Sequence, residues 1–238
     1  MILHTEIRGK GEPAVFLHTG LQTGLTDFVA QREALQKGKK VITPDLRGHG
    51  KSYHEDFSNY FEDAANDLKE TLDHLEFDNI HLIGCSLGGL VGLVFAKKNP
   101  DKLISLTLSG ITADKPEDWE EMHAQDIQFQ KELLQNIDVV NQLDNMHQSD
   151  WKQFIYMAQN QDWYPFEYTS DLANINAPIL VMVGEGNKPE VASASKYQGM
   201  HENVHVSVIP FCSHLVHEQN PEMYTLILEE FLAETGDD

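Results

Sequence analysis

The segment NIHLIGCSLGGLVGLVFAKKNP, from Asn79 to Pro100, is the part of the sequence that decides the fold. It begins with a short apolar run, Ile80–Ile83, which is typical of a buried strand. It continues as a helical stretch that ends at the closing Asn-Pro pair, because proline cannot continue a helix. Ser86 lies at the turn between the two, flanked by Gly84 and Gly88. This arrangement predicts a sharp strand–turn–helix bend with a serine hydroxyl at its tip.

Apolar runs alternate with helical patterns along most of the chain. The runs that read as strands are Ala14–Gly20, Lys40–Gly48, Ile80–Ile83, Leu103–Gly110, Pro178–Gly184 and Val204–Pro210. The helical patterns between and after them include Leu25–Gln36, Phe61–Leu75 and Pro221–Leu232. Such alternation is typical of α/β proteins. The sequence therefore predicts a mostly parallel, twisted sheet with helices on both faces.

One segment interrupts this alternation. Residues 111–170 have a helical pattern and contain all three tryptophans, Trp119, Trp151 and Trp163. They separate two strands that a short crossover could otherwise join. We expect a helical cap over the carboxyl edge of the sheet, where such folds bind ligands. The predicted division is thus a core of residues 1–110 and 171–238, with a cap of residues 111–170.

The composition of the chain limits which partners and which cellular location we expect. The formal net charge of −21 disfavours nucleic acid and anionic membranes as partners. The two cysteines, Cys85 and Cys212, provide no disulfide framework, and neither a signal peptide nor a membrane-spanning run is recognisable. The histidines, including His201 and His205, show no spacing typical of a metal site. We expect a cytoplasmic protein that acts on a small molecule without a metal; the oligomeric state stays open.

Five segments, in order, resemble those of the α/β-hydrolase family: FLHTG, PDLRGHGKS, LIGCSLGG, PILVMVGEGN and FCSHLVHEQNPE. The second and third together are similar to the capped branch that contains esterases, haloperoxidases and C–C bond hydrolases. The third contains the G-x-S-x-G pattern, Gly84-Cys85-Ser86-Leu87-Gly88, in the strand–turn–helix context that the pattern requires. The resemblance implies the α/β-hydrolase fold, a helical cap and no cofactor.

The resemblance also implies roles for individual residues. Ser86 would be the nucleophile and His214, just after the last strand, the general base. The backbone N–H groups of Leu87 and of Gly20, or of Leu21 if the loop is shifted, would form an oxyanion hole. His18 is expected to order its loop. For His217, we expect a surface or cap contact.

The third member of a triad is less evident. The family usually has aspartate after its VGE-x segment, but here the position holds Asn187. Asn187 could orient His214 through its amide oxygen, without a charge. Glu185, Asp114 and Glu190 are the alternatives, although Asp114 precedes Lys115-Pro116 and also reads as a helix N-cap.

These features predict a serine hydrolase that cleaves a small, neutral or apolar ester or related acyl bond through an acyl-enzyme. One alternative is a C–C bond hydrolase, lyase or perhydrolase that uses the same residues. Another is a small-molecule receptor with low turnover, which the asparagine at position 187 favours.

Overall fold

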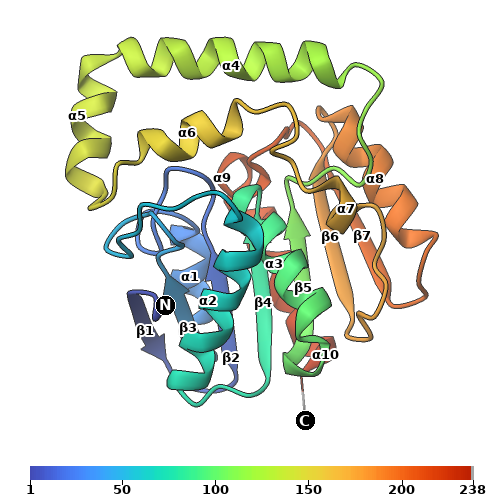
Figure 1. Ribbon diagram of the computed structural model, residues 1–238. Coiled ribbons are helices and arrows are strands. Elements are labelled where there is room, and N and C mark those ends of the chain that lie inside the picture. The colour runs from blue at the N-terminus through green and yellow to red at the C-terminus, as the bar shows by residue number, and fades with distance from the viewer. Residues whose placement is uncertain (237–238) are drawn as a thin grey trace.

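The computed structural model describes residues 1–236, and its centre is a seven-stranded sheet in the order β1-β3-β2-β4-β5-β6-β7 (Figure 1). The strands are β1 (Thr5–Gly9), β2 (Pro13–Leu17), β3 (Lys40–Pro44), β4 (Ile80–Cys85), β5 (Leu103–Ser109), β6 (Ile179–Gly184) and β7 (Val204–Ile209). Strands β2 to β7 are parallel, and β1 pairs with β3 in the antiparallel direction. The prediction of a mostly parallel sheet is confirmed.

β1 was not among the predicted strands, and β2 and β3 are shorter than predicted. β1 is a short edge strand whose last three residues are exposed, so it has no apolar run to mark it. β2 ends at Leu17 rather than Gly20, and β3 ends at Pro44 rather than Gly48. The residues after each strand turn into loops at the carboxyl edge of the sheet, where the candidate site lies.

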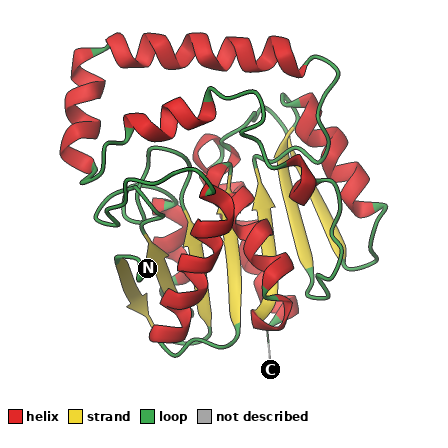
Figure 2. Cartoon of the chain, in the orientation of Figure 1, coloured by secondary structure: helices red, strands yellow, loops and turns green. Residues whose placement is uncertain are grey.

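Helices cover both faces of the sheet (Figure 2). One apolar cluster packs α2 (Tyr60–His74), α3 (Leu87–Lys98) and α8 (Lys188–Gln198) on one face. The other cluster packs α1 (Val29–Leu35), α9 (Val216–Gln219) and α10 (Pro221–Thr235) on the opposite face. A short 3-10 helix spans Pro100–Lys102. Within residues 1–236, none of the helices has both the length and the apolar character needed to cross a bilayer.

Four helices are inserted between β5 and β6: α4 (Trp119–Gln135), α5 (Ile137–Met146), α6 (Lys152–Ala158) and α7 (Phe166–Thr169). In Figure 1, α4, α5 and α6 lie beyond the carboxyl ends of the strands, above the sheet. The buried side chains of the long helix α4 are Trp119 and His123, near its start. We call residues 111–170 the cap.

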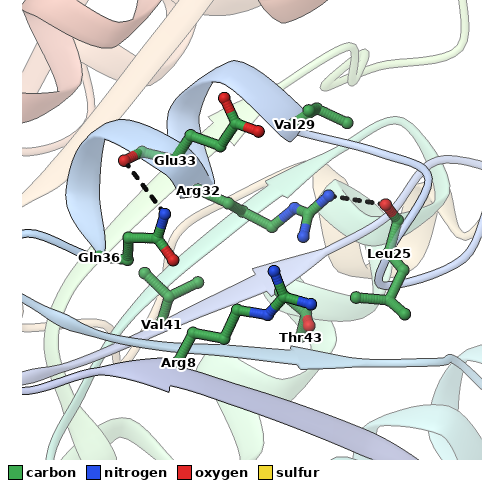
Figure 3. A pocket seen from close by; sticks show the side chains of 8 residues that line it. All are labelled: Arg8, Leu25, Val29, Arg32, Glu33, Gln36, Val41 and Thr43. Carbon is green, nitrogen blue, oxygen red and sulfur yellow. Dashed lines mark hydrogen bonds between the residues drawn. The ribbon is translucent and has the colours of Figure 1, made fainter.

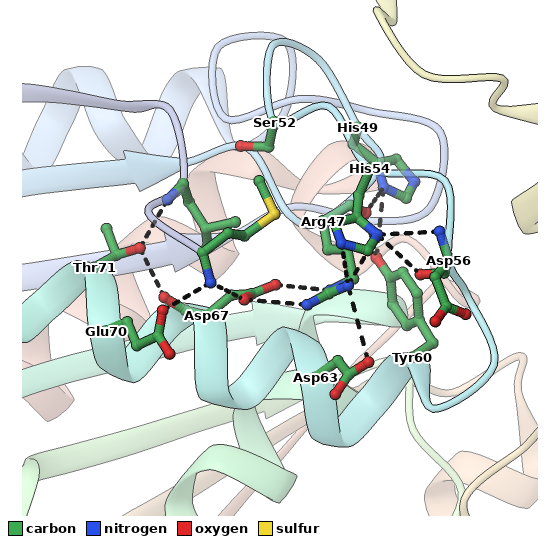
Figure 4. Close-up of polar contacts among 12 residues, drawn as sticks. Arg47, His49, Ser52, His54, Asp56, Tyr60, Asp63, Asp67, Glu70 and Thr71 are labelled. Atoms are coloured by element: carbon green, nitrogen blue, oxygen red, sulfur yellow. Dashed lines mark hydrogen bonds and ion pairs between the residues drawn. The ribbon is translucent and has the colours of Figure 1, made fainter.

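The loop after β3 is held to the core by a buried ion pair. Arg47 Nε donates to Asp67 Oδ2 on α2 at 2.7 Å, and Nη2 donates to Oδ1 at 3.2 Å (Figure 4). Tyr60 adds a hydrogen bond from its hydroxyl to the Arg47 carbonyl at 3.1 Å. Bidentate guanidinium–carboxylate pairs fix geometry as well as charge. Arg47 therefore anchors this loop rather than reaching toward the site.

Candidate active site

Ser86 occupies a strained turn between β4 and α3. Its backbone has φ 52° and ψ −118°, a left-handed conformation that non-glycine residues rarely adopt. The turn packs tightly against the end of β2, because a Cβ atom on Gly88 would lie 2.0 Å from the Leu17 carbonyl oxygen. Ser86 is partly exposed while its neighbours on both sides are buried. The local sequence thus lifts one hydroxyl above the sheet at the start of a helix.

His214 lies in the loop after β7, and its ring reaches Ser86. The Nε2 atom of His214 is 3.0 Å from the Ser86 Oγ atom. Gly110 makes room for this contact: it has φ 63°, and a Cβ atom there would lie 3.0 Å from both His214 Cε1 and the Ser86 backbone nitrogen. A hydroxyl at this distance from an imidazole nitrogen can transfer its proton to the ring.

Glu190 completes the relay on the other side of the ring. Its Oε1 atom lies 2.6 Å from His214 Nδ1, and its side chain is only 3% exposed. Burial raises the pKa of the Glu190 carboxyl, while hydrogen bonds from His214 and Asn187 act in the opposite direction. A carboxylate here holds Nδ1 protonated, which leaves Nε2 free to accept the serine proton.

The prediction that Asn187 contacts His214 is wrong, and the reason is local. Asn187 is the N-cap of α8: its Oδ1 atom accepts the Glu190 N–H at 3.3 Å. Its Nδ2 atom donates to Glu190 Oε1 at 2.7 Å, so the asparagine holds the carboxylate rather than the histidine. One pattern in the sequence could have indicated this role for Asn187. It is an N-cap residue followed by glutamate at the third helical position, which is a capping-box pattern.

The other two candidates for the acid lie elsewhere. Glu185 is exposed at the end of β6. Asp114 is exposed and forms an ion pair with Lys196 at 2.5 Å. The N-cap of α4 is Asp118, so Asp114 does not cap that helix either.

The loop after β2 brings further backbone donors toward Ser86. His18 orders this loop: its Nδ1 donates to the Thr19 carbonyl at 2.8 Å, and its Nε2 accepts the Leu46 N–H at 2.8 Å. The N–H of Thr19 is taken by Asp27 Oδ2 at 2.7 Å. The next backbone N–H groups along the chain belong to Gly20 and Leu21, and the strand before them ends against Gly88, in the first turn of α3.

A buried ion pair joins this loop to the segment that carries His214. His217 Nε2 lies 2.7 Å from Asp27 Oδ1, and both side chains are at most 1% exposed. Asp27 and the neighbouring Cys85 raise the pKa of His217 to about 10 despite burial, and His217 lowers the pKa of Asp27 to about 2. The expected surface or cap contact of His217 is therefore wrong. The position of His217 in the sequence did not indicate that its side chain is buried against Asp27.

The same pair belongs to a group that could hold a metal ion. Asp27, His217 and Glu218 place one ligand atom each within 4.8 Å of one another. Two of the three are already bonded to each other, and the third is exposed. The contacts of this group are those of a structural ion pair. Cys85 and Cys212 are buried free thiols, as expected.

Side chains of the cap lie directly over the loop after β2. A Cβ atom on Gly20 would be 3.1 Å from the Phe154 ring on α6. His147 Nε2 donates to the Leu21 carbonyl at 3.1 Å, and its Nδ1 accepts the Gly50 N–H at 2.8 Å. On α4, burial raises the pKa of the Asp126 carboxyl, while His123 and His214 act in the opposite direction. The cap thus places an apolar ring next to the loop that follows β2.

Comparison with known proteins agrees with this geometry. The sequence model described as alpha/beta hydrolase fold matches residues 13–137, more than half of the chain. The chain is 34% identical over 116 residues to the serine hydrolase BPHL of Mus musculus, a match that covers 47% of this chain and 40% of that protein. It spans about two-fifths of the length of the curated relatives that it matches first, with 42%, 40% and 42% covered.

Solved structures match over nearly the whole chain. NosK from Streptomyces actuosus superposes with a TM-score of 0.81 and 27% identity, covering 95% of this chain and all (100%) of NosK. A thermophilic esterase from Thermogutta terrifontis superposes with a TM-score of 0.77 and 26% identity, covering 99% of this chain and 94% of the esterase. With the family model, these matches show that the chain belongs to the α/β-hydrolase family.

Proposed function

We propose that this protein is a serine hydrolase that cleaves a small, neutral or apolar ester or a related acyl bond. The observation that carries the proposal is the continuous relay from Ser86 Oγ to His214 Nε2 at 3.0 Å and from His214 Nδ1 to Glu190 Oε1 at 2.6 Å. Both distances lie within the range needed for a nucleophile, its base and the group that orients the base.

In this proposal, the Ser86 oxygen attacks the carbonyl carbon while its proton moves to His214 Nε2. Glu190 stabilises the imidazolium that forms, because its carboxylate is buried beside the ring. The N–H of Leu87 and that of Gly20 or Leu21 hold the developing oxyanion. The imidazolium then protonates the leaving alcohol, and water releases the acid from Ser86 by the same steps in reverse.

The substrate class follows from the charge and apolar character around the relay. The chain carries a net charge of −21. A substrate carboxylate next to this site would be repelled. The Phe154 ring beside Gly20 offers apolar contact instead. Both features favour a neutral acyl group of small size.

The same relay could serve C–C bond hydrolysis or perhydrolysis, and substrate screening separates these reactions from ester cleavage. The receptor alternative was favoured because an uncharged residue, Asn187, holds the usual position of the triad acid. In this proposal Glu190 takes the role of that acid, so the argument for a receptor no longer applies.

The proposal is tested by the rate at which a fluorophosphonate probe labels the purified protein. Wild type should label quickly, whereas Ser86→Ala and His214→Ala should not label above background. A series of p-nitrophenyl esters should then show sustained turnover that falls as the acyl chain lengthens. The exposed His205, on β7, provides a matched control: His205→Ala should label like wild type.

Failure of the wild type to label while it remains folded would contradict the proposal. So would labelling that persists in Ser86→Ala, because the reactive group would then lie elsewhere.

A further inference from the structure

A cavity of about 250 Å³ lies away from the relay, between α1 and the strands β1 and β3 (Figure 3). It is lined by Arg8, Leu25, Val29, Arg32, Glu33, Gln36, Val41 and Thr43. Figure 3 shows the guanidinium groups of Arg8 and Arg32 next to each other in this cavity. The Glu33 carboxylate points away from Arg8, toward Val29.

The pairing of two arginines is unusual in this chain. The sequence contains three arginines against 38 acidic residues, so each has many possible carboxylate partners. Arg47 has two, Asp67 at 2.7 Å and Asp63 at 3.8 Å. Among residues 1–236, no carboxylate oxygen lies within 4.0 Å of the Arg8 or Arg32 guanidinium. Two adjacent guanidinium groups without a direct carboxylate contact leave donors on which an anion could be bound.

The donors of Arg32 are only partly used. Its Nε donates to the Asp27 carbonyl at 2.8 Å, and its Nη2 donates to the Leu25 carbonyl at 2.7 Å. These bonds fix the guanidinium in place and leave its Nη1 group available. Burial and the neighbouring Arg8 charge lower the pKa of Arg32, while Asp27 and Glu33 act in the opposite direction. An anion between the two guanidiniums would relieve the repulsion of these like charges.

We propose that this cavity, which we call the arginine pocket, binds a short-chain organic carboxylate. The carboxylate would lie between Arg8 and the free donors of Arg32, because guanidinium groups match the planar carboxylate geometry. Leu25, Val29 and Val41 provide an apolar side for a short alkyl chain. Inorganic phosphate shares the charge but has nothing to place against these side chains. The site is separate from Ser86, so the proposal does not depend on the proposed function.

The arginine side-chain signals of the ¹⁵N-labelled full-length protein give a direct test. The chain has three arginines, so its spectrum contains three Nε–Hε signals, and the Arg47 signal serves as an internal control. Sodium butyrate, sodium phosphate and sodium chloride are titrated separately at matched ionic strength. We expect butyrate to shift the Arg8 and Arg32 signals with one shared, saturable Kd, while Arg47 stays in place and chloride has no saturable effect.

Two variants sharpen the test. Arg8 is exposed on the edge strand β1, so Arg8→Ala should fold normally and weaken butyrate binding by about tenfold or more. Lys10→Ala removes the same charge from an exposed residue outside the pocket lining, and should change the Kd by less than about twofold.

Three results would overturn the proposal. The first is the absence of a saturable shift at Arg8 and Arg32. The second is saturation with phosphate but not with butyrate, which would assign the pocket to a different anion. The third is equal weakening by Arg8→Ala and Lys10→Ala, which would show a general effect of charge rather than a site.

Discussion

Replacing Glu190 by glutamine tests the most specific feature of the relay, which is the pairing of a buried carboxylate with His214. Glu190 Oε1 accepts two hydrogen bonds, from His214 Nδ1 at 2.6 Å and from Asn187 Nδ2 at 2.7 Å. In Glu190→Gln, the amide oxygen can still accept both bonds, whereas the amide NH₂ in that position would face two donors. Asn187 therefore keeps the glutamine oxygen toward the ring, and the histidine tautomer is preserved.

The decrease in kcat expected for Glu190→Gln then comes only from the loss of the Glu190 negative charge. A carboxylate whose charge lies about 4 Å from that of the imidazolium contributes about 4 kcal/mol at an effective dielectric constant of about 20. This corresponds to a decrease in kcat of about 10³. It is smaller than the decrease of about 10⁴ known for a triad whose amide substitution also forces the wrong tautomer.

A second variant separates charge from orientation. In Asn187→Ala/Glu190→Gln, nothing fixes the amide, so its NH₂ group can turn toward His214 and enforce the wrong tautomer. We expect kcat to fall about tenfold further, to about 10⁴ below wild type. Asn187→Ala alone leaves a symmetric carboxylate and should lower kcat by about tenfold at most. It should also reduce the free energy of unfolding by about 0.5–2 kcal/mol through loss of the N-cap.

The assays are single-turnover labelling by fluorophosphonate and turnover of p-nitrophenyl acetate, with thermal unfolding to verify that each variant is folded. Glu185→Gln is the matched control, because it removes an exposed carboxylate from the same segment and should behave like wild type. Activity of Glu190→Gln within about tenfold of wild type would refute the role of the carboxylate. Equal activity of the single and double variants would refute the orienting role of Asn187.

Three further predictions concern stability. Gly88→Ala should prevent folding, because its Cβ would lie 2.0 Å from a β2 carbonyl oxygen, whereas Gly38→Ala, with no atom within 4 Å, should express and melt like wild type. His217→Gln should cost about 3–5 kcal/mol in urea unfolding, because it leaves the buried Asp27 charge without its partner. Since Cys85 and Asp27 together raise the pKa of His217 from 6.5 to about 10, this cost should be fully present below pH 6.5 and should shrink toward pH 10; a constant cost would contradict the pairing. Burial lowers the pKa of His147 from 6.5, so protonation favours the unfolded state, and the free energy of unfolding should fall as the pH drops below 6.5, less steeply in His147→Gln.

The sequence by itself determined the class of fold, and it pointed to two of the three residues that the structure joins by hydrogen bonds. The alternation of apolar runs and helical patterns marks a parallel sheet, because strand and helix periodicities are local properties of the chain. Ser86 and His214 were evident because each follows a recognisable strand within a short motif, and the structure places them 3.0 Å apart. The antiparallel strand β1 was not predicted, because its edge position leaves it largely exposed and it has no apolar run.

Only the tertiary structure decided which carboxylate meets His214. The segment from Glu185 to Glu190 offered three candidates, Glu185, Asn187 and Glu190, and spacing could not say which one turns inward. The start of α8 decides it: Asn187 caps the helix, and the first helical turn brings the Glu190 carboxylate to His214 Nδ1. The pairing of Asp27 with His217 is likewise invisible in sequence, since the two residues are 190 positions apart and meet only when the sheet is formed.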